Sequence, residues 1–175
     1  APVVGTITQP TCTIATGSVV LSGLPSSGTW TLTRNPGNVT TTGTGTSTTI
    51  NGLSAGTYTY TGANACGCTS APSSNVVINT QPPTPSVPVV GTITQPTCAV
   101  STGSVILSGL PSTGTWTLTR TPGGTTTTGS GTSTTISGLT PGTYSFTVTN
   151  ASGCTSAASS NVVINTNPWC HPHLL

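Results

Sequence analysis

Cysteine and histidine are the residue types in this chain that could act as nucleophiles or metal ligands, with six Cys and two His. A Cys–His nucleophile needs a third group to orient it, and a structural zinc ion needs four well-spaced ligands. The candidate zinc ligands are Cys66 and Cys68 in a C-x-C stretch, with Cys170, His171 and His173 in the tail. Their spacing is poor for zinc, so we expect neither a metal site nor a catalytic site.

Charged side chains are almost absent, and this excludes several function classes. Arg34 and Arg120 are the two charged residues, and Asp, Glu and Lys do not occur. Without carboxylates there is no acid–base pair and no calcium or magnesium cage. Without clustered Lys and Arg there is no nucleic-acid surface. No apolar run approaches the length of a membrane span. We therefore expect no enzyme, no cofactor, no nucleic-acid partner and no membrane insertion.

The chain contains two copies of one unit. Pro2 matches Pro88, and the same offset of 86 residues relates Cys12 to Cys98 and Cys68 to Cys154. A unit of this length exceeds a solenoid repeat and suits a small β-sandwich. We predict domains at 1–79 and 88–165, a Pro-rich linker at 80–87 and a divergent tail at 166–175. Because residues 1–5 match the junction at 87–91, we expect a mature product or a segment of a longer array.

Composition predicts an all-β fold. Thr and Val are abundant, whereas the helix-favouring residues Glu, Lys and Met do not occur. Short runs of these residues, punctuated by Gly and Pro, indicate strands. The first copy is expected to form strands at 3–8, 18–22, 29–34, 38–42, 46–50, 56–61 and 75–79. Seven short strands are typical of an immunoglobulin-like sandwich, so we predict two tandem domains of this kind.

Alternation within the strands indicates which side chains form each core. Large apolar residues alternate with threonines, so the two sets face opposite sides of a strand. The predicted core residues are Trp30, Leu32, Tyr58, Trp116, Leu118 and Tyr144. Arg34 and Arg120 end the Trp-containing strands, where we expect rim positions with their stems on apolar neighbours.

Four cysteines recur at matching positions, and we predict disulfides Cys12–Cys68 and Cys98–Cys154. A core with so few large side chains is marginal, and closing such a loop contributes about 4 kcal/mol in the loop-entropy treatment. Cys66 aligns with Ser152, so the repeat does not explain it. It could replace Cys68 as the partner of Cys12, or bond to Cys170 in the same chain or in a neighbour.

The Val-rich end strands are candidate polymerisation edges, because an unpaired strand can add to a neighbour's sheet. The residues concerned are Val3, Val4, Ile7, Val76, Val77 and Ile78. Asn38 and Asn150 each begin an N-x-Ser/Thr glycosylation pattern, so the protein is a candidate glycoprotein.

Each unit reads Q-P-T-C, then T-G-S-V, then G-L-x-x-G-T-Y-x-(Y/F), then G-C-T-S, over residues 9–70 and 95–156. This order resembles the SprB-type repeats of Bacteroidetes gliding-motility adhesins and related secreted surface proteins. The resemblance implies immunoglobulin-like domains in long arrays exported to the bacterial cell surface. Members of that family often carry acidic residues where this chain has Asn64 and Asn150, a departure that speaks against a calcium-dependent role.

These observations lead to two functional hypotheses. The first is an extracellular structural or adhesive repeat protein, a surface stalk or filament subunit whose domains associate head to tail with copies of themselves or adjacent repeats. The alternative is a carbohydrate-binding adhesin module that recognises surface glycans through exposed aromatics such as Tyr60 or Trp169.

Overall fold

Alternating threonines and apolar residues form strands in both copies of the repeat. The computed structural model describes residues 1–167 and divides the chain into two units, 1–82 and 83–175. The division falls inside the stretch predicted as a linker. No helix that could cross a membrane occurs in the part of the chain that is described.

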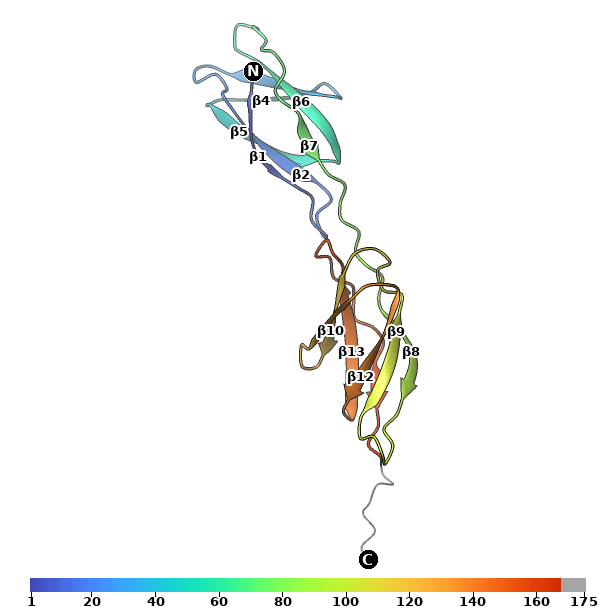
Figure 1. Cartoon of the computed structure of the whole chain (residues 1–175). Helices are drawn as coiled ribbons and strands as arrows, with labels where there is room; N and C mark the ends of the chain where they lie inside the picture. Colours follow the sequence, from blue (N-terminus) through green and yellow to red (C-terminus); the bar gives the residue numbers. More distant parts are fainter. Residues whose placement is uncertain (168–175) are drawn as a thin grey trace, which may run out of the picture. The chain divides into compact units, whose positions relative to one another are not determined.

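The first unit contains two antiparallel sheets (Figure 1). One has the order β1-β2-β5 and the other β4-β3-β6-β7. The strands are β1 (Val3–Thr8), β2 (Gly17–Ser22), β3 (Trp30–Asn35), β4 (Val39–Gly43), β5 (Ser47–Leu53), β6 (Gly56–Ala63) and β7 (Val76–Ile78). Buried side chains from both sheets belong to one cluster, so the sheets face each other across a single core.

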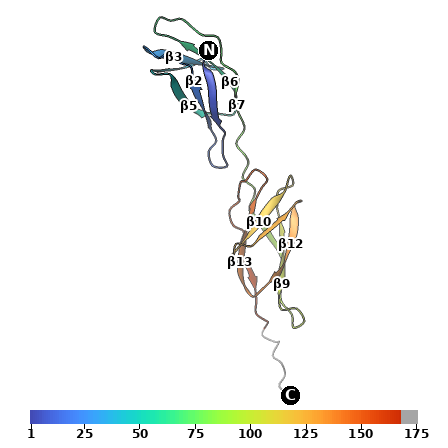
Figure 2. The same cartoon turned by 60° about the vertical axis from the view of Figure 1, so that its left-hand side comes forward.

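The second unit repeats this plan, with sheets β12-β9-β8 and β11-β10-β13-β14. Figure 2 shows β10 and β13 of one sheet opposite β9 and β12 of the other. The strands are β8 (Val89–Thr94), β9 (Gly103–Ser108), β10 (Trp116–Thr121), β11 (Thr126–Gly129), β12 (Ser133–Leu139), β13 (Gly142–Thr149) and β14 (Val162–Ile164). Paired sheets of three and four antiparallel strands are the arrangement of an immunoglobulin-like sandwich. The predicted fold class is therefore confirmed.

The cores contain the side chains that alternation predicts. Trp30, Leu32 and Tyr58 are buried in the first unit, and Trp116, Leu118 and Tyr144 in the second. Each tryptophan lies over a glycine of the neighbouring strand. A Cβ added to Gly43 would stand 2.4 Å from Cη2 of Trp30, so a glycine is required for the indole to lie flat there. The indole Nε1 donates to Gly45 O at 2.7 Å.

Strand β1 departs from simple alternation. Val4 pairs with Leu21, and Ile7 pairs with Val19. The chain thus advances three residues along β1 while it advances two along β2. Such a β-bulge turns the strand and changes which face a side chain occupies. Val4 and Ile7 consequently both pack against the core, although their spacing would place them on opposite faces of a regular strand. The second unit has the same irregularity between Val90 and Ile93.

Candidate functional site

The matched cysteines lie at opposite ends of each sandwich. In the first unit, Cys12 O accepts from Gln81 Nε2 at 3.1 Å, beyond the end of β7. Cys68 belongs to the loop at the far end of β6, where its N–H donates to Asn64 Oδ1 at 2.9 Å. Cys68 is an exposed free thiol, whereas Cys12 is disulfide-bonded. The predicted Cys12–Cys68 bond is therefore wrong.

The second unit shows the same separation. Cys98 lies beside Asn167, past the end where Ile164 pairs with Gly142. Cys154 lies at the other end of β13, next to the bridge between Thr149 and Thr155. The eight residues of β13 span about 23 Å, and a disulfide needs Cα atoms within about 7 Å. Both cysteines are disulfide-bonded, but the predicted Cys98–Cys154 pairing is wrong.

Two thiols remain in the Cys66-Gly67-Cys68 loop. Both are exposed and free. No group of three metal-binding side chains occurs among residues 1–167. Cys170, His171 and His173, the other members of the candidate zinc set, lie outside the described residues, as does Trp169.

A glutamine side chain occupies the outer edge of β7, a feature that the sequence analysis missed. Gln9 Nε2 donates to Val77 O at 2.9 Å, and Gln9 Oε1 accepts from Asn79 N at 2.8 Å. In the second unit Gln95 makes the same two bonds, to Val163 O and from Asn165 N. A side-chain amide offers one donor and one acceptor, as a strand backbone does. The recurrence of Gln in both Q-P-T-C motifs was the available signal.

The two bonds from the Gln9 side chain, here called the glutamine clamp, lie on the predicted polymerisation edge at 76–78. Val76 and Ile78 point into the core, and the carbonyl of Val77 and the N–H of Asn79 are bonded to the side chain of Gln9. Natural sheets commonly block their edges in this way. Two backbone groups along this edge are therefore already bonded within the unit, and pairing of 76–78 with another chain stays a prediction. On β1, the side chain of Val3 remains exposed.

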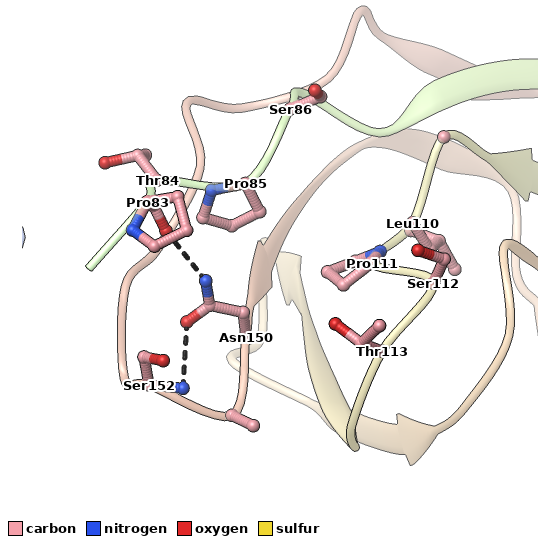
Figure 3. A pocket seen from close by; sticks show the side chains of 12 residues that line it. Pro83, Thr84, Pro85, Ser86, Leu110, Pro111, Ser112, Thr113, Asn150 and Ser152 are labelled. Atoms are coloured by element: carbon pink, nitrogen blue, oxygen red, sulfur yellow. Dashed lines mark hydrogen bonds between the residues drawn. The ribbon is translucent and has the colours of Figure 1, made fainter. Parts of the chain in front are cut away.

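A hollow lies at the end of the second unit, where a loop organised by Asn150 meets the segment 83–86 (Figure 3). Asn150 Oδ1 accepts from Ser152 N at 3.1 Å and from Cys154 N at 3.0 Å. Asn150 Nδ2 donates to Pro83 O at 2.9 Å. One amide thus fixes the loop and joins it to the Pro-rich segment. The hollow is lined by residues 83–86, 109–113 and 150–152.

The first unit has the same loops at the corresponding end. Asn64 Oδ1 accepts from Cys66 N at 3.1 Å and from Cys68 N at 2.9 Å. Two adjoining hollows there are lined by residues that include 23–26, Ser27 and 64–66. These are the repeat counterparts of 109–113 and 150–152. Among the described residues, Asn64 Nδ2 has no hydrogen-bond partner that corresponds to Pro83 O.

The two candidate glycosylation sites differ in access. Asn38 is exposed. Asn150 is half-buried, and its amide nitrogen already donates to Pro83 O. Asn38 is therefore the more accessible of the two candidate glycosylation sites.

Each arginine lies against an aromatic ring, and neither has an Asp or Glu partner because the sequence contains neither residue type. The guanidinium carbon of Arg34 lies 5.2 Å from the ring centroid of Tyr58, and Arg120 stands at the same distance from Tyr144. Such cation–π contacts stabilise a rim cation without a salt bridge. Arg120 also donates to Thr125 Oγ1 at 3.0 Å.

Tyr60 is buried, with 1% of its surface exposed, so it cannot serve as the sugar platform that the carbohydrate-binding hypothesis requires. Its hydroxyl has no hydrogen-bond partner among the described residues. Burial raises the pKa of the Tyr60 phenol above its ordinary value; nearby Arg34 opposes this shift and Tyr58 adds to it. The counterpart in the second unit is Phe146, which carries no hydroxyl.

Threonines cover the outer face of each four-stranded sheet. Across the strands Thr31 pairs with Thr42, and Thr33 pairs with both Thr40 and Thr61. Because the large residues of these strands face the core, the hydroxyls face water. The hydroxyls on this face bind water on a sheet that carries almost no charge. The second unit has the same face, formed by Thr117, Thr119, Thr126, Thr128 and Thr147.

No protein-family model matches the chain, and no curated protein matches it. Solved structures similar to it include chicken CNTN1 domains FN1–FN3, at 16% identity and a TM-score of 0.41, covering 95% of this chain and 64% of that one. A C-terminal intimin fragment in complex with the intimin-binding domain of its translocated receptor is 15% identical, with a TM-score of 0.44 and coverage of 94% and 64%. The BSP domain of a biofilm-associated protein is 16% identical, with a TM-score of 0.33 and coverage of 95% and 29%. The chain thus spans less than two thirds of each of these three chains.

Proposed function

We propose that this chain is a structural and adhesive repeat protein of the cell exterior, part of a stalk or filament in which copies associate head to tail. One observation carries the proposal: the second unit reproduces the first strand for strand, with the same hydroxylated outer face and the same glutamine clamp. Each unit has its own core, and a glutamine covers part of one sheet edge, which limits unwanted edge pairing between neighbouring modules.

The chemistry of the surface supports this role. Among residues 1–167, Cys12, Cys98 and Cys154 are disulfide-bonded, which fits an oxidising compartment outside the cytosol. The sequence lacks carboxylates and lysine, so hydroxyls and amides carry the hydration and no general acid–base pair is present. The motif order that resembles SprB-type repeats of Bacteroidetes surface proteins supports the same conclusion.

The test is imaging of the protein isolated from its native source, by electron microscopy of unstained or negatively stained material. We expect fibres or extended strands, and we expect labelling of intact cells by a membrane-impermeant reagent. Dispersed single chains together with labelling only after lysis would overturn the proposal. A glycan array tests the carbohydrate-binding alternative, which the burial of Tyr60 already weakens.

A further inference from the structure

Two free thiols lie in the loop that follows β6, separated by a single residue. Cys66 and Cys68 are both exposed, and Gly67 lies between them. The other three cysteines among residues 1–167 are disulfide-bonded. Within the described part of the chain, the Cys66-Gly67-Cys68 loop is therefore where thiol chemistry is available.

The side chain of Asn64 holds this loop in one conformation. Asn64 Oδ1 accepts from Cys66 N at 3.1 Å and from Cys68 N at 2.9 Å. The backbone adds two bonds, from Asn64 N to Cys68 O at 3.1 Å and from Gly67 N to Asn64 O at 2.9 Å. Four hydrogen bonds thus involve Asn64, and both cysteines are attached to a backbone that is already ordered.

The turn at Gly67 brings the two cysteines closer together than a strand would. Its φ is 79°, in the left-handed region, and a Cβ added there would have nothing within 4 Å. In an extended strand, Cα atoms two residues apart are separated by about 6.6 Å, and a tight turn shortens this distance. A disulfide needs Cα atoms roughly 4.4–6.8 Å apart. The backbone therefore permits an S–S bond between Cys66 and Cys68.

The second unit contains the same loop with a serine in place of the first cysteine. Asn150 Oδ1 accepts from Ser152 N and from Cys154 N, and Gly153 also has a φ of 79°. The loop thus adopts its conformation without a cysteine at the first position, so Cys66 is not needed to fold it. Cys154, at the second position, is disulfide-bonded, so a loop of this kind holds a disulfide on that residue.

We propose that Cys66 and Cys68 form a dithiol site that undergoes stoichiometric thiol–disulfide exchange with small-molecule disulfides. Cys68 forms the mixed disulfide, at the position where its counterpart Cys154 is disulfide-bonded, and Cys66 resolves it. This activity goes beyond the structural role proposed above and does not depend on how copies of the chain associate.

The exchange has two steps. The Cys68 thiol gives up its proton, and its thiolate attacks one sulfur of the incoming disulfide, whose S–S bond breaks and whose other half leaves as a thiol. The Cys66 thiolate then attacks Cys68 Sγ, forms the Cys66–Cys68 bond and releases the second small thiol. The protein loses two electrons and two protons, and the incoming disulfide gains them, so atoms and electrons balance.

Proximity favours the second step. The ordered turn holds Cys66 beside the mixed disulfide, whereas a second small thiol would have to reach it from solution. In the second unit Ser152 has no thiol for this attack, so a disulfide on Cys154 is not resolved within its own loop. The two units therefore differ in whether the loop releases a thiol that becomes bonded to it.

The test treats the full-length chain with oxidised glutathione and maps the disulfides by mass spectrometry without reduction. We expect a Cys66–Cys68 bond within one chain and the release of two glutathione thiols for each loop that closes. Cys66→Ser should release one glutathione and retain the other on Cys68. A wild-type chain that carries glutathione on both cysteines, or chains joined in pairs through this loop, would overturn the proposal.

Asn64→Ala tests whether the ordered turn positions the two thiols, because both cysteine N–H groups lose their acceptor. At a fixed ratio of reduced to oxidised glutathione, we expect the proportion of closed loop to loop carrying glutathione to fall several-fold. Asn150→Ala removes the equivalent bonds in the second unit and should leave this proportion unchanged. An unchanged proportion in Asn64→Ala would contradict the positioning by Asn64. Failure of the exchange would leave the stalk or filament proposal in place, since that proposal rests on the repeated architecture.

Discussion

Gln9 and Val77, 68 residues apart in the chain, are joined by a hydrogen bond of 2.9 Å from the side-chain amide to the backbone carbonyl. With the second bond from Asn79 N, one side chain takes the place of a neighbouring strand along β7. The first and last strands of the unit are thus linked at their ends, and two backbone groups at the edge of β7 are satisfied within the unit.

Gln9→Ala should destabilise the first unit by about 1–2 kcal/mol, because two hydrogen bonds to backbone groups are lost. The amide hydrogen of Asn79 should exchange with solvent much faster, as measured by hydrogen–deuterium exchange. Gln95→Ala should have the same effect on Asn165 in the second unit.

Gln81→Ala is the control, since the side chain of Gln81 donates to Cys12 O rather than bonding to Val77 or Asn79. In Gln81→Ala, the amide hydrogen of Asn79 should exchange with solvent at the wild-type rate. Unchanged Asn79 protection in Gln9→Ala would show that the glutamine clamp does not protect the backbone at the end of β7.

Gly43→Ala should destabilise the first unit by about 1–3 kcal/mol through overpacking, because the new methyl would overlap the indole of Trp30. Urea unfolding followed by tryptophan fluorescence measures the loss, with a shift in the native emission as the ring is displaced. Thr42→Ala, on the outer face next to it, should change stability by much less. Equal stability of the two variants would mean that the indole does not lie on Gly43.

Tyr60→Phe should raise the free energy of unfolding of the first unit by about 1 kcal/mol, since it removes a buried hydroxyl without a partner. The effect should grow at alkaline pH. Burial raises the pKa of Tyr60 in the folded state, so the unfolded chain releases its proton first, and stability falls as pH rises past about 10. Tyr60→Phe should lack this extra decline.

Urea unfolding is measured at a series of pH values. Hydrogen exchange distinguishes unfolding of the first unit from that of the second. The second unit, with Phe146 at this position, is the internal control. A Tyr60→Phe variant with the same alkaline decline as the wild type would exclude Tyr60 as its cause.

Iodoacetamide applied to the native, unreduced protein should modify Cys66 and Cys68 and should leave Cys12, Cys98 and Cys154 unmodified. Peptide mapping by mass spectrometry reads the result. Protection of Cys68 together with a Cys12–Cys68 peptide pair would restore the pairing predicted from the repeat and contradict the structure.

The sequence by itself determined the all-β class, the duplication and most of the strands. Strand β1 has the bounds that the sequence predicted from its residue types and the flanking glycines and prolines. Strand β3, which contains Trp30, begins and ends one residue later than predicted. These features are local: β-branched and aromatic residues alternate with threonine, and glycine and proline interrupt them. The same alternation identifies Trp30 and Leu32 as core residues, because a strand must place successive side chains on opposite faces.

Only the tertiary structure decided which residues meet. Cys12 and Cys68 match in every copy, but their loops lie at opposite ends of the sandwich, and spacing along the chain carries no information on which end a loop occupies. The bulge after Val4 reverses the face of the residues that follow it, and the bonds from Gln9 depend on the proximity of the first and last strands. A repeat reveals equivalence between positions, whereas contact depends on the path of the chain in space.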